Sequence, residues 1–156
     1  MNQESMAPVV LVTGAARRVG AEIARQLQAA GARVALHFRS SRGDAEALAA
    51  DLNGIRPGSA AIFQADLLDS ASLPGLVSAV VERFGRLDGL VNNASSFFPT
   101  ALGQIDDAAW LDLMGSNLKA PLFLSQAAAP HLKLSGGAII NIVDIHAERP
   151  LKGYPL

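Results

Sequence analysis

The chain has 156 residues, of which 50% are hydrophobic and 17% are charged, and its formal net charge is −1. This composition is that of one globular domain with a sizeable core, and the near-neutral charge gives no support for a nucleic-acid or membrane-surface partner. The absence of cysteine excludes disulfides, thiol catalysis and thiolate metal sites, and no metal site is predicted.

Predicted strands and helices alternate along the chain. Short apolar runs rich in β-branched residues predict strands buried on both faces, and apolar residues at helical spacing predict the helices between them. The expected elements are strand 9–12, helix 21–27, strand 33–38, helix 44–52, strand 60–64, helix 73–84, strand 87–93, helix 106–132 and strand 138–143. Asp44 is expected to cap the second helix, and Pro121 to kink the fourth. This alternation predicts a doubly wound parallel sheet, a Rossmann fold, with strand order 3-2-1-4-5 and ligands at the carboxyl ends of its strands.

A glycine-containing turn joins the first strand to the first helix. Gly14 permits a tight turn, and Gly20 permits close packing of the helix on the sheet. A strand, a glycine turn and a helix in this order can hold a phosphate at the helix N-terminus. Arg17 and Arg18 fall in the first helical turn, where the helix dipole disfavours cations. They are either solvated surface arginines or ligands of a polyanion that outweighs this repulsion.

The end of the second strand contains no acidic residue. In dinucleotide-binding folds an acid at this position binds the ribose 2′-hydroxyl, whereas an arginine accommodates a 2′-phosphate. Arg39 offers a planar guanidinium and Ser40 a hydroxyl, a pair that suits a phosphate. An ordinary polar loop is the alternative interpretation. His37, taken alone, fits a packed or solvated histidine better than a catalyst.

Polar and aromatic residues follow the third and fourth strands. Asp66 offers an acceptor for an adenine amino group, although an aspartate after a strand is often a cap. Residues 92–95, Asn-Asn-Ala-Ser, bring amides and a small alanine to a place where a cofactor approaches closely. Phe97 and Phe98 are either core residues or a flat stacking surface for a planar ring.

These motifs, in this order and at these spacings, resemble the short-chain dehydrogenase/reductase family over essentially the whole chain. The matching residues are Thr13, Gly14, Gly20, Asp66, Asn92, Asn93, Ala94 and Asn117. More narrowly, the chain resembles the pteridine reductase branch, which includes bacterial dihydromonapterin/dihydrofolate reductase-like members. Residues 13–20, residues 92–99 and Asp144 carry this narrower resemblance. Arg18 stands where most of the wider family has a glycine, and Asp144 where most has a catalytic serine.

The resemblance implies NADPH as the cofactor and a pterin-like small molecule as the substrate. The implied cofactor residues are Gly14, Arg17, Arg18, Val19 and Gly20 at the pyrophosphate, His37, Arg39 and Ser40 at the ribose phosphate, Asp66 and Leu67 at the adenine, and Asn93, Ala94 and Ser95 along the nicotinamide half. The implied substrate residues are Arg18, Ser95, Phe97, Asp144 and Tyr154, with Phe97 stacked on the pterin. Asp144 and Asn117 are the implied catalytic residues: Asp144 assists a tyrosine proton donor, and Asn117 anchors a relay water.

The family's proton donor is a tyrosine paired with a lysine four residues later, and this pair has no match here. Tyr154 is the only tyrosine, and a lysine four residues on would lie beyond Leu156. We therefore expect residues 1–156 to be a single NADP-binding domain, the N-terminal portion of a longer reductase that transfers hydride to a pterin or dihydrofolate-type substrate. The alternatives are a short-chain reductase of a ketone, sugar or acyl substrate, and a non-catalytic dinucleotide-binding module if the chain ends at Leu156.

The family resemblance also implies a homo-tetramer, assembled through the long fourth helix and the helix that carries the catalytic pair. The N-terminal residues lack the basic and apolar regions of a secretory signal. No apolar run approaches the roughly 20 residues that span a bilayer. We expect a cytoplasmic protein without a membrane partner.

Overall fold

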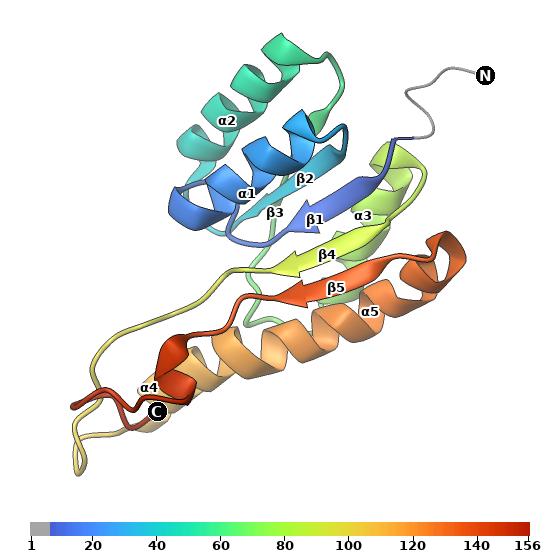
Figure 1. Cartoon of the computed structure of the whole chain (residues 1–156). Coiled ribbons are helices and arrows are strands. Elements are labelled where there is room, and N and C mark those ends of the chain that lie inside the picture. The colour runs from blue at the N-terminus through green and yellow to red at the C-terminus, as the bar shows by residue number, and fades with distance from the viewer. Residues whose placement is uncertain (1–6) are drawn as a thin grey trace.

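The computed structural model describes residues 7–156 and contains one parallel sheet of five strands (Figure 1). The strands are β1 (Val9–Val12), β2 (Arg33–Phe38), β3 (Ala60–Gln64), β4 (Gly89–Asn92) and β5 (Ala138–Asn141). Their order is β3-β2-β1-β4-β5, which confirms the predicted Rossmann topology. The direction of winding reverses between β1 and β4, where a doubly wound sheet opens a crevice for ligands.

Helices cover both faces of the sheet. The helices are α1 (Arg18–Ala29), α2 (Arg42–Ile55), α3 (Leu73–Phe84), α4 (Asp107–Met114) and α5 (Ala120–Ser135). Figure 1 shows α1 and α2 on one face and α3 and α5 on the other. Alternate residues of β1 serve the two cores: Leu11 packs with α3 and α5, and Val12 packs with α1 and α2. This two-sided burial is the reason that β1 is apolar at every position.

The region predicted as one kinked helix is three helical segments in the structure. A π-helical turn, Gly115–Lys119, lies between α4 and α5, and the backbone N–H of Ala120 bonds the carbonyl of Gly115. Pro121 has no N–H to continue the α-helical pattern, so the widened turn lies directly before it. Two helices also begin two to three residues before their predicted starts at residues 21 and 44. The first helix begins at Arg18, and the second begins at Arg42 after Ser41, so that Asp44 lies inside its first turn and is not its cap.

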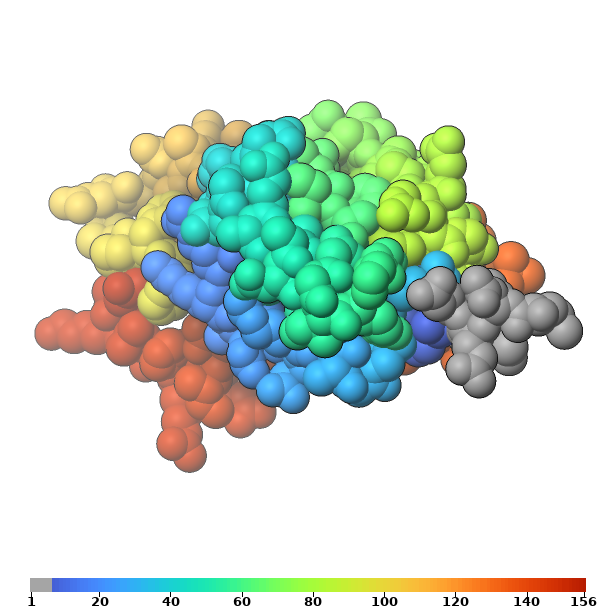
Figure 2. Space-filling view, turned by 90° about the horizontal axis from the view of Figure 1, so that it is seen from above, coloured from blue at the N-terminus to red at the C-terminus, as the bar shows by residue number. Residues whose placement is uncertain are grey.

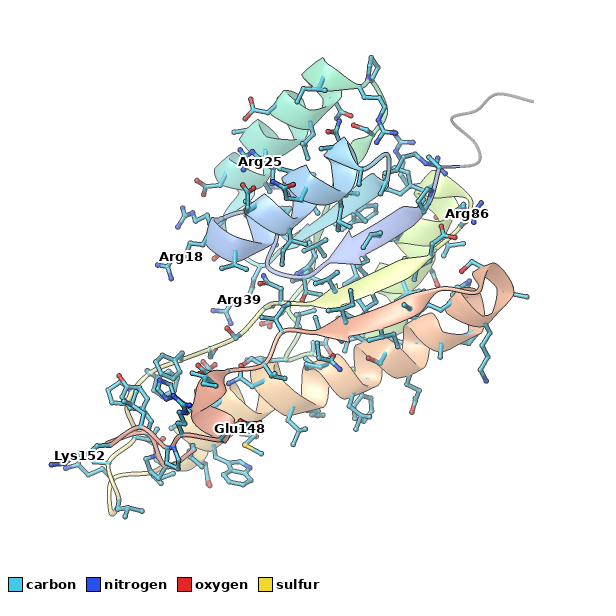
Figure 3. The ribbon with its side chains drawn as sticks, viewed as in Figure 1. Arg18, Arg25, Arg39, Arg86, Glu148 and Lys152 are labelled. Carbon is cyan, nitrogen blue, oxygen red and sulfur yellow. The ribbon has the colours of Figure 1, made fainter. Side chains whose placement is uncertain are left out.

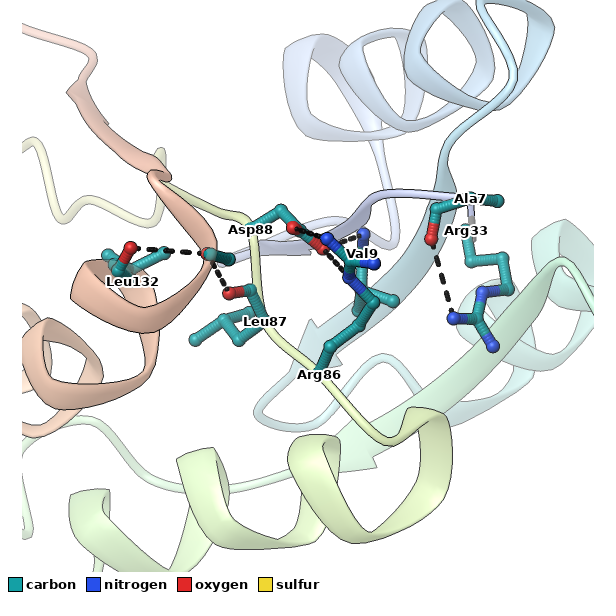
Figure 4. Close-up of polar contacts among 8 residues, drawn as sticks. Ala7, Val9, Arg33, Arg86, Leu87, Asp88 and Leu132 are labelled. Atoms are coloured by element: carbon teal, nitrogen blue, oxygen red, sulfur yellow. Dashed lines mark hydrogen bonds and ion pairs between the residues drawn. The ribbon is translucent and has the colours of Figure 1, made fainter. Parts of the chain in front are cut away.

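Asp88 ties the entry of β4 to the start of β1 at the amino ends of the strands (Figure 4). Its Oδ2 accepts hydrogen bonds from the backbone N–H of Val9 at 2.8 Å and from Nε of Arg86 at 2.7 Å. Burial by itself raises the pKa of Asp88, but the bonds from Arg86 and Val9 outweigh it and hold that pKa below its usual value. Ser135, at the end of α5, donates to the carbonyl of Leu87 at 2.8 Å and fixes the other side of the same corner.

β5 is an edge strand with exposed apolar side chains. Within the strand Ile139 is 38% and Ile140 55% exposed, and directly after it Ile142 is 49% and Val143 80% exposed. The segment after β5 passes beyond the sheet toward α4, and the backbone N–H of Thr100 bonds the carbonyl of Gly153 at 2.8 Å. The space-filling view shows the loop after β4 and the C-terminal segment projecting past the same end of the molecule (Figure 2). Within residues 7–156, no helix is long and apolar enough to cross a bilayer.

Candidate nucleotide-binding site

Thr13 organises the crevice between β1 and β4. Its hydroxyl donates to the carbonyl of Val91 at 3.3 Å and accepts from the backbone N–H groups of Asn93 at 2.9 Å and Ala94 at 3.0 Å. The amide of Asn93 returns a bond to the carbonyl of Thr13 at 2.9 Å. These contacts turn the chain sharply after β4 and hold Asn93 and Ala94 against the glycine turn. Sequence reasoning placed Thr13 in a family motif but gave it no structural role.

The glycine turn is too tight for larger residues. A Cβ on Gly20 would lie 2.2 Å from the carbonyl oxygen of Gly14 and 2.6 Å from the amide nitrogen of Asn93. Gly14 has φ = +61°, and a Cβ there would lie 3.1 Å from the Cα of Ala94. The turn therefore needs glycine at both positions, as predicted, and a third small residue, Ala94, completes the close approach.

Arg18 adopts a backbone conformation that favours glycine. Its φ is +51°, and it is the one non-glycine residue with positive φ in the described part of the chain. An L-residue pays roughly 1–2 kcal/mol in this region. Its side chain projects from the start of α1 at the carboxyl ends of the strands (Figure 3). Backbone strain retained at such a place is typical of a functional residue.

Arg17 forms an ion pair with Asp44 that joins the start of α1 to the start of α2. Its Nε donates to Oδ2 of Asp44 at 2.7 Å, and its Nη2 lies 2.6 Å from the same oxygen. The hydrogen bond from Arg17 holds the pKa of Asp44 below its usual value. Asp44 lies in the first turn of α2, so this pair bridges the gap between the ends of β1 and β2. Sequence reasoning missed this role of Asp44; the only signal was a cationic first turn in α1 with no acid of its own.

His37 supports the site from within the core. Its side chain is buried, Nδ1 accepts the backbone N–H of Gly14 at 3.2 Å, and Nε2 lies 3.1 Å from the carbonyl of Ala65. Burial lowers the pKa of His37 below the ordinary histidine value. The expected direct contact between His37 and a phosphate is therefore revised. Both ring nitrogens are already bonded to backbone groups, and the residue instead joins the ends of β1, β2 and β3.

The remaining predicted cofactor residues lie around the same end of the sheet. Arg39 and Ser40 are exposed after β2, and the carbonyl of Arg39 is held by the side chain of Gln64 at 2.9 Å. Figure 3 shows Arg39 on the same side of the molecule as Arg18. Asp66 follows β3 and accepts the backbone N–H of Leu68 at 3.0 Å, so one carboxylate oxygen forms a local turn. Val19 and Ser95 are exposed, whereas Leu67 is buried.

Aromatic rings meet where the β4 loop touches the C-terminal segment. The ring of Phe97 stacks on Tyr154 with centroids 4.6 Å apart and planes 9° apart. His146 lies nearly parallel to Phe97, at 11° and 6.4 Å. Phe97 nevertheless keeps 57% of its surface exposed. The structure therefore brings two predicted substrate residues, Phe97 and Tyr154, together and adds His146, which sequence reasoning did not single out.

The two predicted catalytic residues each make local contacts. Oδ1 of Asp144 accepts the backbone N–H of His146 at 2.9 Å and caps a 3₁₀ turn, Ile145–Ala147. The amide of Asn117, in the π-helical turn, accepts from the N–H of Ser96 at 3.1 Å and donates to its carbonyl at 2.9 Å. Asn117 thereby pins the β4 loop that carries Phe97.

A cavity of about 560 Å³ lies elsewhere, along β3 and α3. It shares only Asp66 with the predicted cofactor residues. The crevice at the carboxyl ends of β1 and β4 is the candidate nucleotide-binding site, because it lies where the winding of the sheet reverses and it carries the glycine turn and the arginines.

A doubly wound parallel sheet with this glycine turn at its switch point defines a nucleotide-binding α/β protein. The family model described as short chain dehydrogenase matches residues 8–156. The chain therefore belongs to the short chain dehydrogenase family of oxidoreductases.

Relatives within this family carry different names. The chain is 40% identical to pteridine reductase 1 of Leishmania tarentolae over 194 aligned positions, which cover all of this chain and 67% of the relative. It is 36% identical to a 3-oxoacyl-acyl-carrier-protein reductase of Staphylococcus aureus, covering 90% of this chain and 57% of the relative. It is 39% identical to L-fucose dehydrogenase of Oryctolagus cuniculus, covering 94% and 50%. The chain thus spans between half and two thirds of the length of these relatives.

Proposed function

We propose that this chain binds NADPH and forms part of a reductase that acts on a pterin or dihydrofolate-type substrate. The observation that carries the cofactor choice is the charge at the end of β2. Arg39 follows the strand, residues 37–41 include no acid, and Arg18 projects at the same end of the sheet. A ribose 2′-hydroxyl is usually read by an acid at this position, whereas a 2′-phosphate needs a cation.

The residues present fit a dinucleotide. Gly14, Gly20 and Ala94 bring the backbone of the glycine turn into close contact with the chain after β4 at the N-terminus of α1, where N–H groups and the helix dipole can hold a pyrophosphate. Arg39 and Ser40 would hold the 2′-phosphate, and Asp66 the adenine. When bound, NADPH supplies the hydride, while the protein supplies binding and orientation.

The pterin assignment rests on Phe97 and on one relative. The ring of Phe97 is 57% exposed and lies nearly parallel to Tyr154 and His146, so this cluster of flat rings suits a planar heterocycle. The similarity to pteridine reductase 1 runs over the whole chain. Asp144, beside the same cluster, would assist protonation of the substrate. The similarity to an oxoacyl reductase and to L-fucose dehydrogenase favours a second candidate, a reductase of an acyl or sugar carbonyl.

Replacing Arg39 tests the cofactor. In Arg39→Asp the cation becomes an anion, so we expect NADPH affinity to fall about tenfold or more, because a charge-assisted contact is lost. NADH affinity should be unchanged or increased. Titration calorimetry with both nucleotides measures the ratio. The control is Arg25→Asp, the same charge change on an exposed arginine of α1. Equal NADPH affinity in the two variants would contradict the assignment.

Replacing Phe97 tests the substrate class. In Phe97→Leu the ring is lost while the apolar character remains, so we expect the affinity of the NADPH-loaded protein for dihydrobiopterin to fall about two- to tenfold. Titration calorimetry measures this affinity. Phe98→Leu is the matched control, because Phe98 is its half-buried neighbour. If Phe97→Leu binds dihydrobiopterin as the wild type does, the acyl or sugar carbonyl becomes the better candidate.

A further inference from the structure

Asp44 occupies a place between the two predicted phosphate-binding corners. It lies in the first turn of α2, which follows β2, and Arg17 lies in the turn that follows β1. Their 2.6 Å contact therefore spans the gap between the carboxyl ends of neighbouring strands. No residue role implied by the family resemblance or by the relatives' names includes Asp44.

Arg17 differs from the other two arginines at this end of the sheet. Among residues 7–156, neither Arg18 nor Arg39 has an ion-pair partner within 4.0 Å, whereas Arg17 has Asp44. Arg17 is therefore the one of the three whose charge is already neutralised by the protein. A phosphate that enters the gap can contact Arg18 and Arg39 directly, whereas Arg17 is already paired with the carboxylate of Asp44.

The geometry of the pair leaves it open to exchange. Nε and Nη2 of Arg17 both contact a single oxygen, Oδ2 of Asp44, so the guanidinium is not matched to two acceptors. A phosphate offers Arg17 two oxygens in the bidentate geometry that a guanidinium prefers. Both side chains are well exposed, at 64% and 41%, and exposed ion pairs are weak. A doubly charged phosphate can therefore displace the carboxylate.

We propose that Arg17, which the family resemblance places at the pyrophosphate, contacts the 2′-phosphate beside Arg39. Asp44 is then a specificity-determining residue that competes with this phosphate for Arg17 and so limits the preference of this chain for NADPH over NADH. This inference rests on the proposed function, because it requires a phosphorylated nucleotide at the ends of β1 and β2. The carboxylate acts by occupying the guanidinium that the 2′-phosphate would otherwise bind. Its removal is expected to favour NADPH, which carries the 2′-phosphate, over NADH.

The test uses 2′,5′-ADP and 5′-AMP as probes, because they differ only in the phosphate at issue. We expect Asp44→Asn to bind 2′,5′-ADP about two- to fivefold more tightly than the wild type, the size expected for an exposed ion pair. Its affinity for 5′-AMP should not change. The matched control is Asp51→Asn, which removes the same charge from α2 about two turns further on, where the carboxylate lies 3.7 Å from Arg25.

A second background separates competition for Arg17 from a general charge effect. Arg17→Met removes the guanidinium for which Asp44 and the 2′-phosphate compete. Adding Asp44→Asn to this variant should therefore give no further gain in 2′,5′-ADP affinity. A gain of full size in that background, or unchanged or weaker binding in Asp44→Asn alone, overturns the inference. If the wild type binds neither 2′,5′-ADP nor NADPH, the proposed function fails and the inference fails with it. If both bind and only the Asp44 response is missing, the proposed function stands.

Discussion

At the scale of single residues, Arg18 shows a conflict between backbone conformation and side-chain chemistry. The backbone at φ = +51° suits glycine, yet the position holds an arginine whose exposed side chain projects outward from the start of α1. A strained arginine is retained here, we infer, because its guanidinium contributes binding that glycine cannot supply.

We therefore expect Arg18→Gly to separate stability from binding. Relief of the strained φ should raise the free energy of unfolding by about 1 kcal/mol, and the greater freedom of glycine in the unfolded chain should lower it by about half that amount. The free energy of unfolding in urea should be unchanged or slightly higher, while NADPH affinity by calorimetry should fall. Arg18→Ala keeps the strain and loses the same guanidinium, so it should bind as weakly and be less stable. A clear loss of stability in Arg18→Gly would show that the arginine supports the fold.

At the scale of elements, His37 joins three strand ends through one neutral ring. Nδ1 can accept from Gly14 only while it carries no proton, so protonation breaks this side-chain bond and leaves the backbone bond from Ala15 N–H to the carbonyl of His37. Because burial lowers the pKa of His37 in the folded state, the unfolded chain binds more protons as the pH falls through the ordinary histidine value. Folding stability contributed by His37 is therefore present above about pH 6.5 and is lost progressively below it.

We expect this dependence to disappear in His37→Gln, which does not titrate. Urea unfolding at a series of pH values between 7.5 and 5 should show a fall in stability for the wild type and a smaller slope for the variant, from about pH 6.5 downward. The variant should also be about 1 kcal/mol less stable at pH 7.5, because one backbone hydrogen bond is disturbed. His131→Gln is the control, since it removes a histidine outside this junction. The same slope in wild type and His37→Gln would remove His37 as the cause.

At the scale of the whole molecule, the sheet has two unequal edges. At the β3 edge, the side chain of Asn53 makes paired bonds with Ala60, its Nδ2 to the carbonyl and its Oδ1 to the N–H, each 3.0 Å long. This amide occupies the place of a neighbouring strand and blunts the edge. At the β5 edge, exposed isoleucines accompany an unprotected strand, which is the pattern of a surface prone to association.

We expect the 156-residue chain to associate with itself through the β5 edge. Ile140→Glu places a charge on that strand and should shift sedimentation at micromolar concentration toward the monomer. Ile55→Glu is the matched control, because Ile55 is 77% exposed on α2, beyond the opposite half of the sheet. Equal association of both variants would place the contact elsewhere. The tetramer implied by the family resemblance remains a separate prediction.

The sequence by itself determined the five strands, their order and the existence of the helices between them, because hydrophobic periodicity and glycine are local signals. The runs in β1 and β2 are apolar at nearly every position because both faces are covered, and this marked them as parallel strands. Gly14 and Gly20 were identified by the turn they permit, and the structure shows the close contacts that require them. Asp44 was predicted wrongly as a cap, because a carboxylate near a helix start is usually satisfied by that helix.

Only the tertiary structure decided which side chains face the crevice and which support it. His37 and Arg39 are two residues apart in sequence, yet one is buried between strand ends and the other is exposed. The partners that settle this, Gly14 and Ala65 for His37 and Asp44 for Arg17, are more than 20 residues away. No local pattern encodes such contacts, because the free energy of burying a polar group depends on the partner that the fold brings to it.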